Sequence, residues 1–206
     1  MKFAILALIL LGTVACNKRG GGNVQRPPQP KQDLDMDNSP VPIQNSGAPT
    51  LADFDGRNFI KESDAEQMGA NMDPRVKEKV HYENVNGIHQ WKLGLDELQM
   101  TIWAYTDSSG AGQRLTKEKN EDTTGCQILL KRNMASLAEV KDSGMGNGHM
   151  KRVIRTDGNG VVSYTVQKGN YIIKIGWGDS CPSVQALDDF AQRCQKALSY
   201  VLRKLP

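Results

Sequence analysis

Residues 161–177 read VVSYTVQKGNYIIKIGW, and this stretch decides the fold. On both sides of Gly169-Asn170, apolar and polar side chains alternate one by one. A period of two is typical of a β-strand with unlike faces, and a two-residue Gly-Asn connection is typical of a tight hairpin. The stretch therefore predicts an antiparallel pair whose apolar face another element must cover. The apolar positions are Val162, Tyr164, Val166, Tyr171, Ile173, Ile175 and Trp177.

Further strands are predicted on both sides of this pair. Residues 151–155 precede a turn at 156–160, which extends the pair to a three-stranded antiparallel meander. Residues 98–104 alternate in the same way. Cys126, Ile128 and Leu130 indicate one more strand, with these three side chains on one face.

The last segment of the chain has the pattern of an amphipathic helix. Pro182 suits a first helical turn, acidic residues follow it, and Arg203 and Lys204 stand near the end, where they complement the helix dipole. Such a helix most simply covers the apolar face of the sheet. Its apolar stripe consists of Val184, Leu187, Ala191, Cys194, Leu198, Val201 and Leu205.

Shorter helices are expected before and within the sheet. Residues 63–66 fit a capping box, Asp73-Pro74 leads into a helix over 75–82, and Asn133 caps a helix over 134–141. Polar, glycine-bearing residues 107–125 indicate a long exposed loop. The predicted fold class is α+β: a mostly antiparallel sheet covered by a C-terminal amphipathic helix, with short helices N-terminal to the sheet. This order is loosely similar to the PsbP-like sandwich.

The first 15 residues, MKFAILALILLGTVA, have the layout of a secretory signal peptide. Lys2 supplies the positive charge, and residues 3–11 are an unbroken apolar run. A membrane span needs about 20 such residues. An uncleaved N-terminal anchor is the alternative.

Thr13-Val14-Ala15-Cys16 resembles the lipobox of bacterial lipoproteins. The resemblance implies cleavage before Cys16, a diacylglycerol thioether on its thiol, and acylation of the new amino group, with palmitate as the expected chain. Thr13 departs from the pattern, in which leucine is common, so ordinary cleavage after Ala15 without lipid is the alternative. The resemblance implies an anchored protein of the bacterial cell envelope that faces the periplasm.

Three domains follow from composition: the signal peptide at 1–15, a lipidated, disordered Pro/Gly-rich tether at 16–50, and one globular domain at 51–206. The tether holds six of the nine prolines and few large apolar residues. The globular part has 21 basic and 20 acidic residues. This balance argues against nucleic-acid binding, which usually shows a concentrated basic excess.

Cys126, Cys181 and Cys194 remain after Cys16 is assigned to lipid, and export favours a disulfide. In a helix, Cys181 and Cys194 would lie roughly 18 Å apart, beyond the limit of about 7 Å between bonded Cα atoms. If residues 126–130 form a strand, Cys126 and Cys181 lie at one edge of the sheet. A Cys126–Cys181 disulfide is therefore predicted, with Cys126–Cys194 as the alternative.

Catalytic signals are weak. Cys181 at a helix start, or Ser180, could act with His149 in a small envelope hydrolase. The sequence context of a known nucleophile is missing, and the spacing of the histidines and cysteines matches no metal site, so no cofactor is expected.

The favoured interpretation is a noncatalytic binding or structural module, with an envelope protein or an anionic polymer as partner and the membrane as its anchor. One cluster of basic residues could bind an anionic glycan or lipid headgroup; the alternative is a solvated sheet edge, where such side chains discourage aggregation. The cluster consists of Lys131, Arg132, Lys151, Arg152 and Arg155.

Overall fold

The computed structural model describes residues 50–72, 74–75, 78–94 and 98–206. The signal peptide at 1–15, Cys16 and the tether up to residue 49 lie outside these residues, as does Asp73. By its internal contacts the chain divides into Met1–Gln44 and Asn45–Pro206. The description below concerns the second unit.

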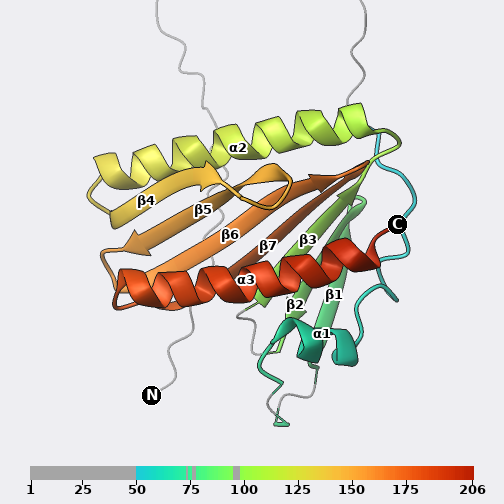
Figure 1. The fold of residues 1–206 in the computed structure, drawn as a ribbon, viewed down its shortest axis with the longest axis horizontal. Coiled ribbons are helices and arrows are strands. Elements are labelled where there is room, and N and C mark those ends of the chain that lie inside the picture. Colours follow the sequence, from blue (N-terminus) through green and yellow to red (C-terminus); the bar gives the residue numbers. More distant parts are fainter. Residues whose placement is uncertain (1–49, 73, 76–77, 95–97) are drawn as a thin grey trace, which may run out of the picture. The chain divides into compact units, whose positions relative to one another are not determined.

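In these described residues, seven antiparallel strands form one sheet in the order β1-β2-β3-β7-β6-β5-β4 (Figure 1). The two meanders β1–β3 and β4–β7 are each continuous in sequence, and the β3–β7 pair joins them. The strands are β1 (Val80–Val85), β2 (Ile88–Leu93), β3 (Leu98–Ala104), β4 (Ala135–Asp142), β5 (Asn147–Arg155), β6 (Asn159–Lys168) and β7 (Tyr171–Ser180).

The hairpin predicted at Gly169-Asn170 is confirmed. Lys168 pairs with Tyr171, and the register continues to Asn159 opposite Ser180. The meander of β5, β6 and β7 is therefore confirmed too. A second tight hairpin joins β1 to β2 through Asn86 and Gly87, both with positive φ, as a two-residue turn of this hand requires.

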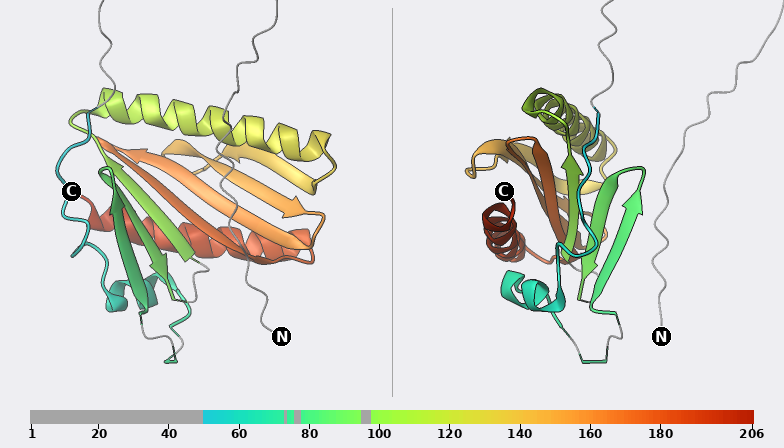
Figure 2. Two further views of the ribbon diagram at one scale, coloured as in Figure 1. Left: turned by 180° about the vertical axis from the view of Figure 1, so that it is seen from behind. Right: turned by 90° about the vertical axis from the view of Figure 1, so that its right-hand side faces the viewer.

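Helices cover both faces of the sheet. Along β7, Ile173, Ile175 and Trp177 join the core beneath α3 (Val184–Lys204), whereas Ile172 joins a smaller cluster with Ala111 of α2 (Ser108–Lys131). Figure 2 shows α2 and α3 on opposite sides of the strands. The C-terminal helix that covers an apolar sheet face is confirmed.

Helix α3 supplies most of the helical contribution to the main core. Ser183 caps it by accepting a hydrogen bond from the Ala186 amide, so the helix begins after Pro182 rather than at it. Val184, which was expected in the apolar stripe, is exposed. The buried side chains of the helix are Leu187, Phe190, Cys194, Ala197, Leu198 and Val201.

Helix α1 (Glu62–Met68) braces α3 through one carboxylate. Asp64 is buried and accepts hydrogen bonds from the Lys61 amide, the Tyr200 hydroxyl and the Lys204 ammonium. The capping interaction expected at residues 63–66 is present two residues earlier, with Lys61 as the N-cap and its amide donating to Asp64.

The loop predicted at 107–125 is wrong, because residues 108–125 belong to α2. Asp107 caps the helix by accepting from the Gly110 amide, and two ion pairs with a spacing of four residues support it. The side chains that face the sheet include Glu118 and Asp122. A stripe that contains buried charges escapes a search for apolar periodicity.

Three related predictions are also wrong. Residues 126–130 are helical, residues 135–142 form strand β4 instead of a helix, and residues 80–82 begin β1 instead of continuing a helix. The first prediction rested on a short apolar pattern that also fits a helix, and the other two rested on capping signals. Pairing with a neighbouring strand, or packing on the sheet, decides the element in each case.

The structure contains Cys126, Cys181 and Cys194 as free, buried cysteines. The strand on which the Cys126–Cys181 pairing depended is a helix. Cys126 packs with Ala135 and Val153 on the α2 side, whereas Cys181 and Cys194 lie in the core beneath α3. The sheet therefore separates Cys126 from both of the partners that were considered for it.

Leu198→Ala should lower the free energy of unfolding by about 3 kcal/mol, because it leaves a cavity at a fully buried position of α3. Leu130→Ala, at a position of α2 that is 44% exposed, should change it by less than about 0.5 kcal/mol. Urea unfolding measures both values. Equal losses for the two variants would contradict the core assigned to α3.

Candidate functional site

A pocket of about 330 Å³ opens on the α2 side of the sheet. Helix α2 lies along one border of this face and leaves the middle strands uncovered (Figure 2, left). The pocket is lined by Gln99, Thr101, Lys151, Val161, Ser163, Lys174, Gly176, Trp177 and Gly178.

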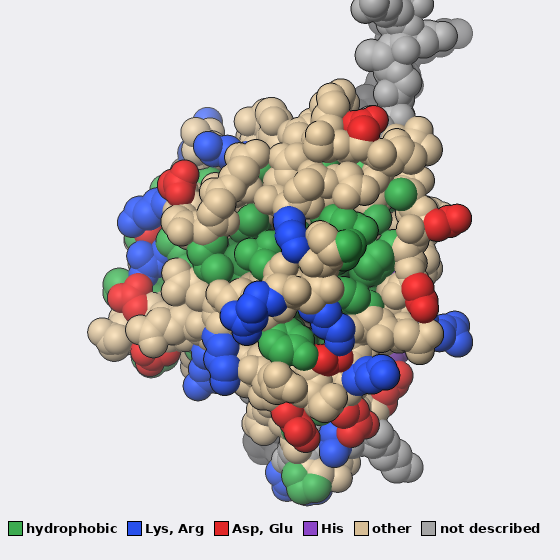
Figure 3. Space-filling model, turned by 45° about the vertical axis from the view of Figure 1, so that its right-hand side comes forward, with side chains coloured by type: hydrophobic (Ala, Val, Ile, Leu, Met, Phe, Trp, Pro, Cys, Tyr) green, Lys and Arg blue, Asp and Glu red, His purple; other side chains and the backbone are tan. Residues whose placement is uncertain are grey.

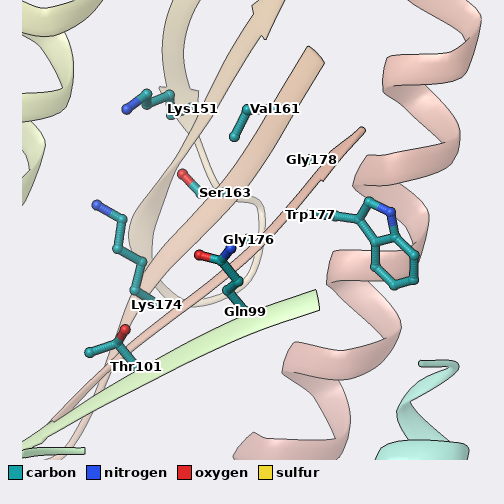
Figure 4. Close-up of a pocket in the computed structure, with 9 residues that line it drawn as sticks. All are labelled: Gln99, Thr101, Lys151, Val161, Ser163, Lys174, Gly176, Trp177 and Gly178. Carbon is teal, nitrogen blue, oxygen red and sulfur yellow. The ribbon is translucent and has the colours of Figure 1, made fainter. Parts of the chain in front are cut away.

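Strand pairing explains why these residues meet. Gln99 of β3 lies opposite Gly176 of β7, which lies opposite Ser163 of β6, which in turn lies opposite Lys151 of β5. Thr101 and Lys174 face each other one step further along the strands. Figure 4 shows these side chains projecting to one side, with the Trp177 ring turned the other way toward α3.

Two ammonium groups stand where the pocket meets α2. Lys151 Nζ lies 2.9 Å from Asp122 Oδ1, and Lys174 Nζ lies 2.7 Å from Glu118 Oε2 and 3.5 Å from Asp122 Oδ2. Both carboxylates are buried. The carboxylate of Asp122 thus lies between the two lysine ammonium groups.

The ion-pair network beneath α2 has one positive charge in excess when His149 is neutral. Lys151 and Lys174 at the pocket match Glu118 and Asp122 in number, and the excess comes from Arg114, which pairs with Glu118 outside the pocket lining. Burial works against ionisation of Asp122, but the hydrogen bond from His149 and the charges of Lys174 and Lys151 hold the pKa of this carboxyl well below its usual range. Asp122 is therefore ionised at any physiological pH.

A buried polar layer lies beneath α2. His149 Nε2 donates to Asp122 Oδ2 at 3.1 Å, and the opposite strand places Thr165 beside His149. Within the described part of the chain, neither His149 Nδ1 nor Thr165 Oγ1 has a hydrogen-bond partner. Arg114 also lies over the Trp103 ring, 4.6 Å from its centroid. Charges and polar groups thus make up much of the contact between α2 and the sheet.

The basic cluster expected from the sequence is not assembled in one place. Only Lys151 reaches the pocket. Arg152 points to the other face, where it pairs with Glu139 and Asp188, and Arg155 pairs with Asp157 at the end of β5. Lys131 and Arg132 lie at the exposed C-terminal end of α2.

The residues considered for hydrolysis are also kept apart. Cys181 is buried in the core beneath α3, and its thiol donates to the Ser183 carbonyl. His149 lies on the opposite side of the sheet, paired with Asp122. Ser180 is exposed at the end of β7. The geometry brings neither nucleophile to the histidine.

Several pocket residues were missed in the sequence, namely Gln99, Thr101, Ser163, Lys174 and Gly176. The signal that could have found them is the second face of the alternating strands. Each of them lies between apolar residues of its own strand, and side chains at these positions share one face of the sheet.

Hydrophobic side chains reach the surface on another side of the domain, with lysine and arginine between them (Figure 3). Half-buried hydrophobic residues such as Phe59 and Tyr200 pack against the main core. Arg193 lies over Trp177 and Lys204 over Phe59, with 4.8 and 5.5 Å to the ring centroids. Core packing and cation–π contacts therefore account for partly exposed hydrophobic side chains such as Phe59 and Tyr200.

In the described residues, no group of three or more histidine, cysteine or acidic side chains could hold a metal ion. Within the same residues, no helix is both long and apolar enough to cross a membrane. The chain matches no model of a known protein family, and a search of curated protein sequences found no similar protein.

Asp122→Asn should lower the free energy of unfolding at pH 7 by about 2 kcal/mol, because Lys151, Lys174 and His149 lose a charged partner. The pKa of Asp122 is depressed in the folded state. Its contribution is therefore complete above its unfolded value of 3.8 and is lost as the pH falls further. The gap between wild type and variant should stay constant from pH 7 to about 4 and narrow below that.

Urea unfolding at a series of pH values measures this gap. Glu121→Gln, at the preceding and exposed position of α2, is the matched control and should leave stability within about 0.5 kcal/mol. A gap that widened on acidification would contradict the ion pairing assigned to Asp122.

Proposed function

We propose that this chain is a lipid-anchored protein of the bacterial cell envelope, facing the periplasm, and that its folded domain is a noncatalytic module that binds an anionic polymer. The anchor rests on the sequence of residues 1–16: a short apolar run, a small-residue cleavage context, and Cys16 directly after it. The binding role rests on the pocket beside α2.

The observation that carries the binding role is the convergence of Lys151 and Lys174 on an open pocket. An ammonium group has three N–H donors. Lys151 uses one on Asp122, and Lys174 directs one to Glu118, with Asp122 as a more distant contact. The remaining donors are available to a ligand, and both side chains are about one quarter exposed.

Internal pairing has a second effect, which favours binding over a purely structural role. Glu118 and Asp122 fix the positions of the two ammonium groups before any ligand arrives. Less side-chain freedom is then lost on binding. The excess positive charge also attracts an anionic ligand at a distance.

Lys174→Gln and Lys151→Gln should each weaken binding of polygalacturonate and polyphosphate about tenfold, since a hydrogen bond to a charged group contributes about 1.5 kcal/mol. Isothermal titration calorimetry at two salt concentrations, with protein purified in non-ionic detergent, measures this loss. The affinity of the wild type should fall as salt rises.

Two variants serve as controls for this measurement. Lys174→Arg keeps the charge and should retain most of the affinity. Lys196→Met removes an exposed lysine of α3, on the far side of the sheet, and should leave binding within twofold. If Lys196→Met lost as much affinity as Lys174→Gln, general charge rather than this pocket would explain binding.

The anchor has its own test. The intact mass of the protein purified from membranes should correspond to a chain that begins at Cys16 and carries acyl chains. Each buried methylene contributes about 0.8 kcal/mol to membrane binding, so this modification accounts for firm anchoring. A chain that begins at unmodified Cys16 would contradict the lipid anchor and leave the binding role to be judged on its own.

A further inference from the structure

The floor of the pocket is bare backbone. On the face of β7 that carries Lys174, the next two positions are Gly176 and Gly178, so no side chain rises from the strand at these two positions. Gly176 lies between Gln99 on one neighbouring strand and Ser163 on the other. The result is a shallow seat with polar side chains on both sides.

The fold does not require glycine at position 176. Its φ is not positive. A Cβ added there would meet its nearest neighbours, Ser163 Cβ and the Val162 carbonyl oxygen, at 3.6 Å, which is ordinary van der Waals contact. Glycine inside a strand weakens the strand, and it often marks a place where a ligand approaches the backbone closely. Glycine at position 176 therefore leaves the floor of the pocket open.

The groups around this floor suit hydroxyls as well as an anion. Thr101 and Ser163 offer hydroxyl groups, and Gln99 offers an amide with both donors and acceptors. Lys151 and Lys174 stand together at the border with α2. An inorganic anion would use only the lysines and leave the neutral groups without ligand partners.

The size of the pocket limits the ligand. Its volume of about 330 Å³ is near the lower end of the range for small-molecule sites, about 300–1,000 Å³. One ring therefore fits better than a stretch of several units held side by side.

We propose that the pocket binds one acidic sugar residue of the polymer: the ring rests on the backbone at Gly176, its hydroxyls bond to Gln99, Thr101 and Ser163, and its carboxylate lies against Lys151 and Lys174. This inference rests on the proposed anion-binding function and names its ligand. Gly176 is then a residue that determines specificity.

Gly176→Ala tests the seat. The variant should fold with equal or greater stability, because alanine fits the strand without strain. It should bind polygalacturonate at least tenfold more weakly, since its methyl group occupies the floor, while polyphosphate binding should change less than twofold. Galacturonic acid monomer should compete with polygalacturonate on the wild type, and neutral dextran should not bind.

The full chain is used throughout, with calorimetry for binding and urea unfolding for stability. Gly125→Ala is the matched control, because the Cβ it adds on α2 meets no atom within 4 Å. It should leave the affinity for both polymers unchanged.

The outcomes separate the two proposals. If Gly176→Ala leaves polygalacturonate binding intact while Lys174→Gln weakens it, anion binding stands and the sugar seat is wrong. If dextran binds as well as polygalacturonate, the ligand is not an acidic sugar. If the wild type binds neither anionic polymer, the proposed function fails and the sugar seat fails with it.

Discussion

Alternation along β7 is the constraint on which the rest of the structure depends. The apolar core beneath α3 contains the side chains of Ile173, Ile175 and Trp177, whereas Lys174 and Gly176 lie on the opposite face of the strand. Because a strand has a period of two, the apolar face cannot be buried without turning the polar positions to the opposite side. Helix α3 covers the apolar face of the sheet, and α2 and the pocket lie on the opposite face.

Different interactions attach the two helices to the sheet. Helix α3 is attached mainly by buried leucine, valine and alanine side chains, with Asp188 and Lys204 in ion pairs beside them. Helix α2 faces the sheet with Glu118 and Asp122, whose partners are Lys174, Lys151 and His149. A buried ion pair adds little net stability but strongly disfavours any arrangement in which one partner is missing. The ion pairs thus fix the position of α2, and they thereby fix the border between the pocket and α2.

The sequence predicted the elements whose period was unambiguous: the β5–β7 meander, strand β3 and the C-terminal helix. It failed at α2, because the inward positions of that helix carry Glu118 and Asp122, and at β4, because a run of eight residues fits either kind of element. Of the candidate anion site, only Lys151 was named. Lys174 lies 23 residues later in the chain, and only the strand register brings it close to Lys151.

Strand order also has a consequence for how the chain reaches its native state. Five of the six strand pairs join neighbours in sequence, and the sixth is the β3–β7 seam, where Leu98 meets Trp177 and Ala104 meets Tyr171. Local hairpins close quickly, whereas contacts between distant residues must first overcome loop-closure entropy. Among the strand pairings, this seam therefore has the largest loop-closure cost. The pocket spans this seam, with Gln99 and Thr101 on one side and Gly176 on the other, so its lining is complete only after the two meanders have paired.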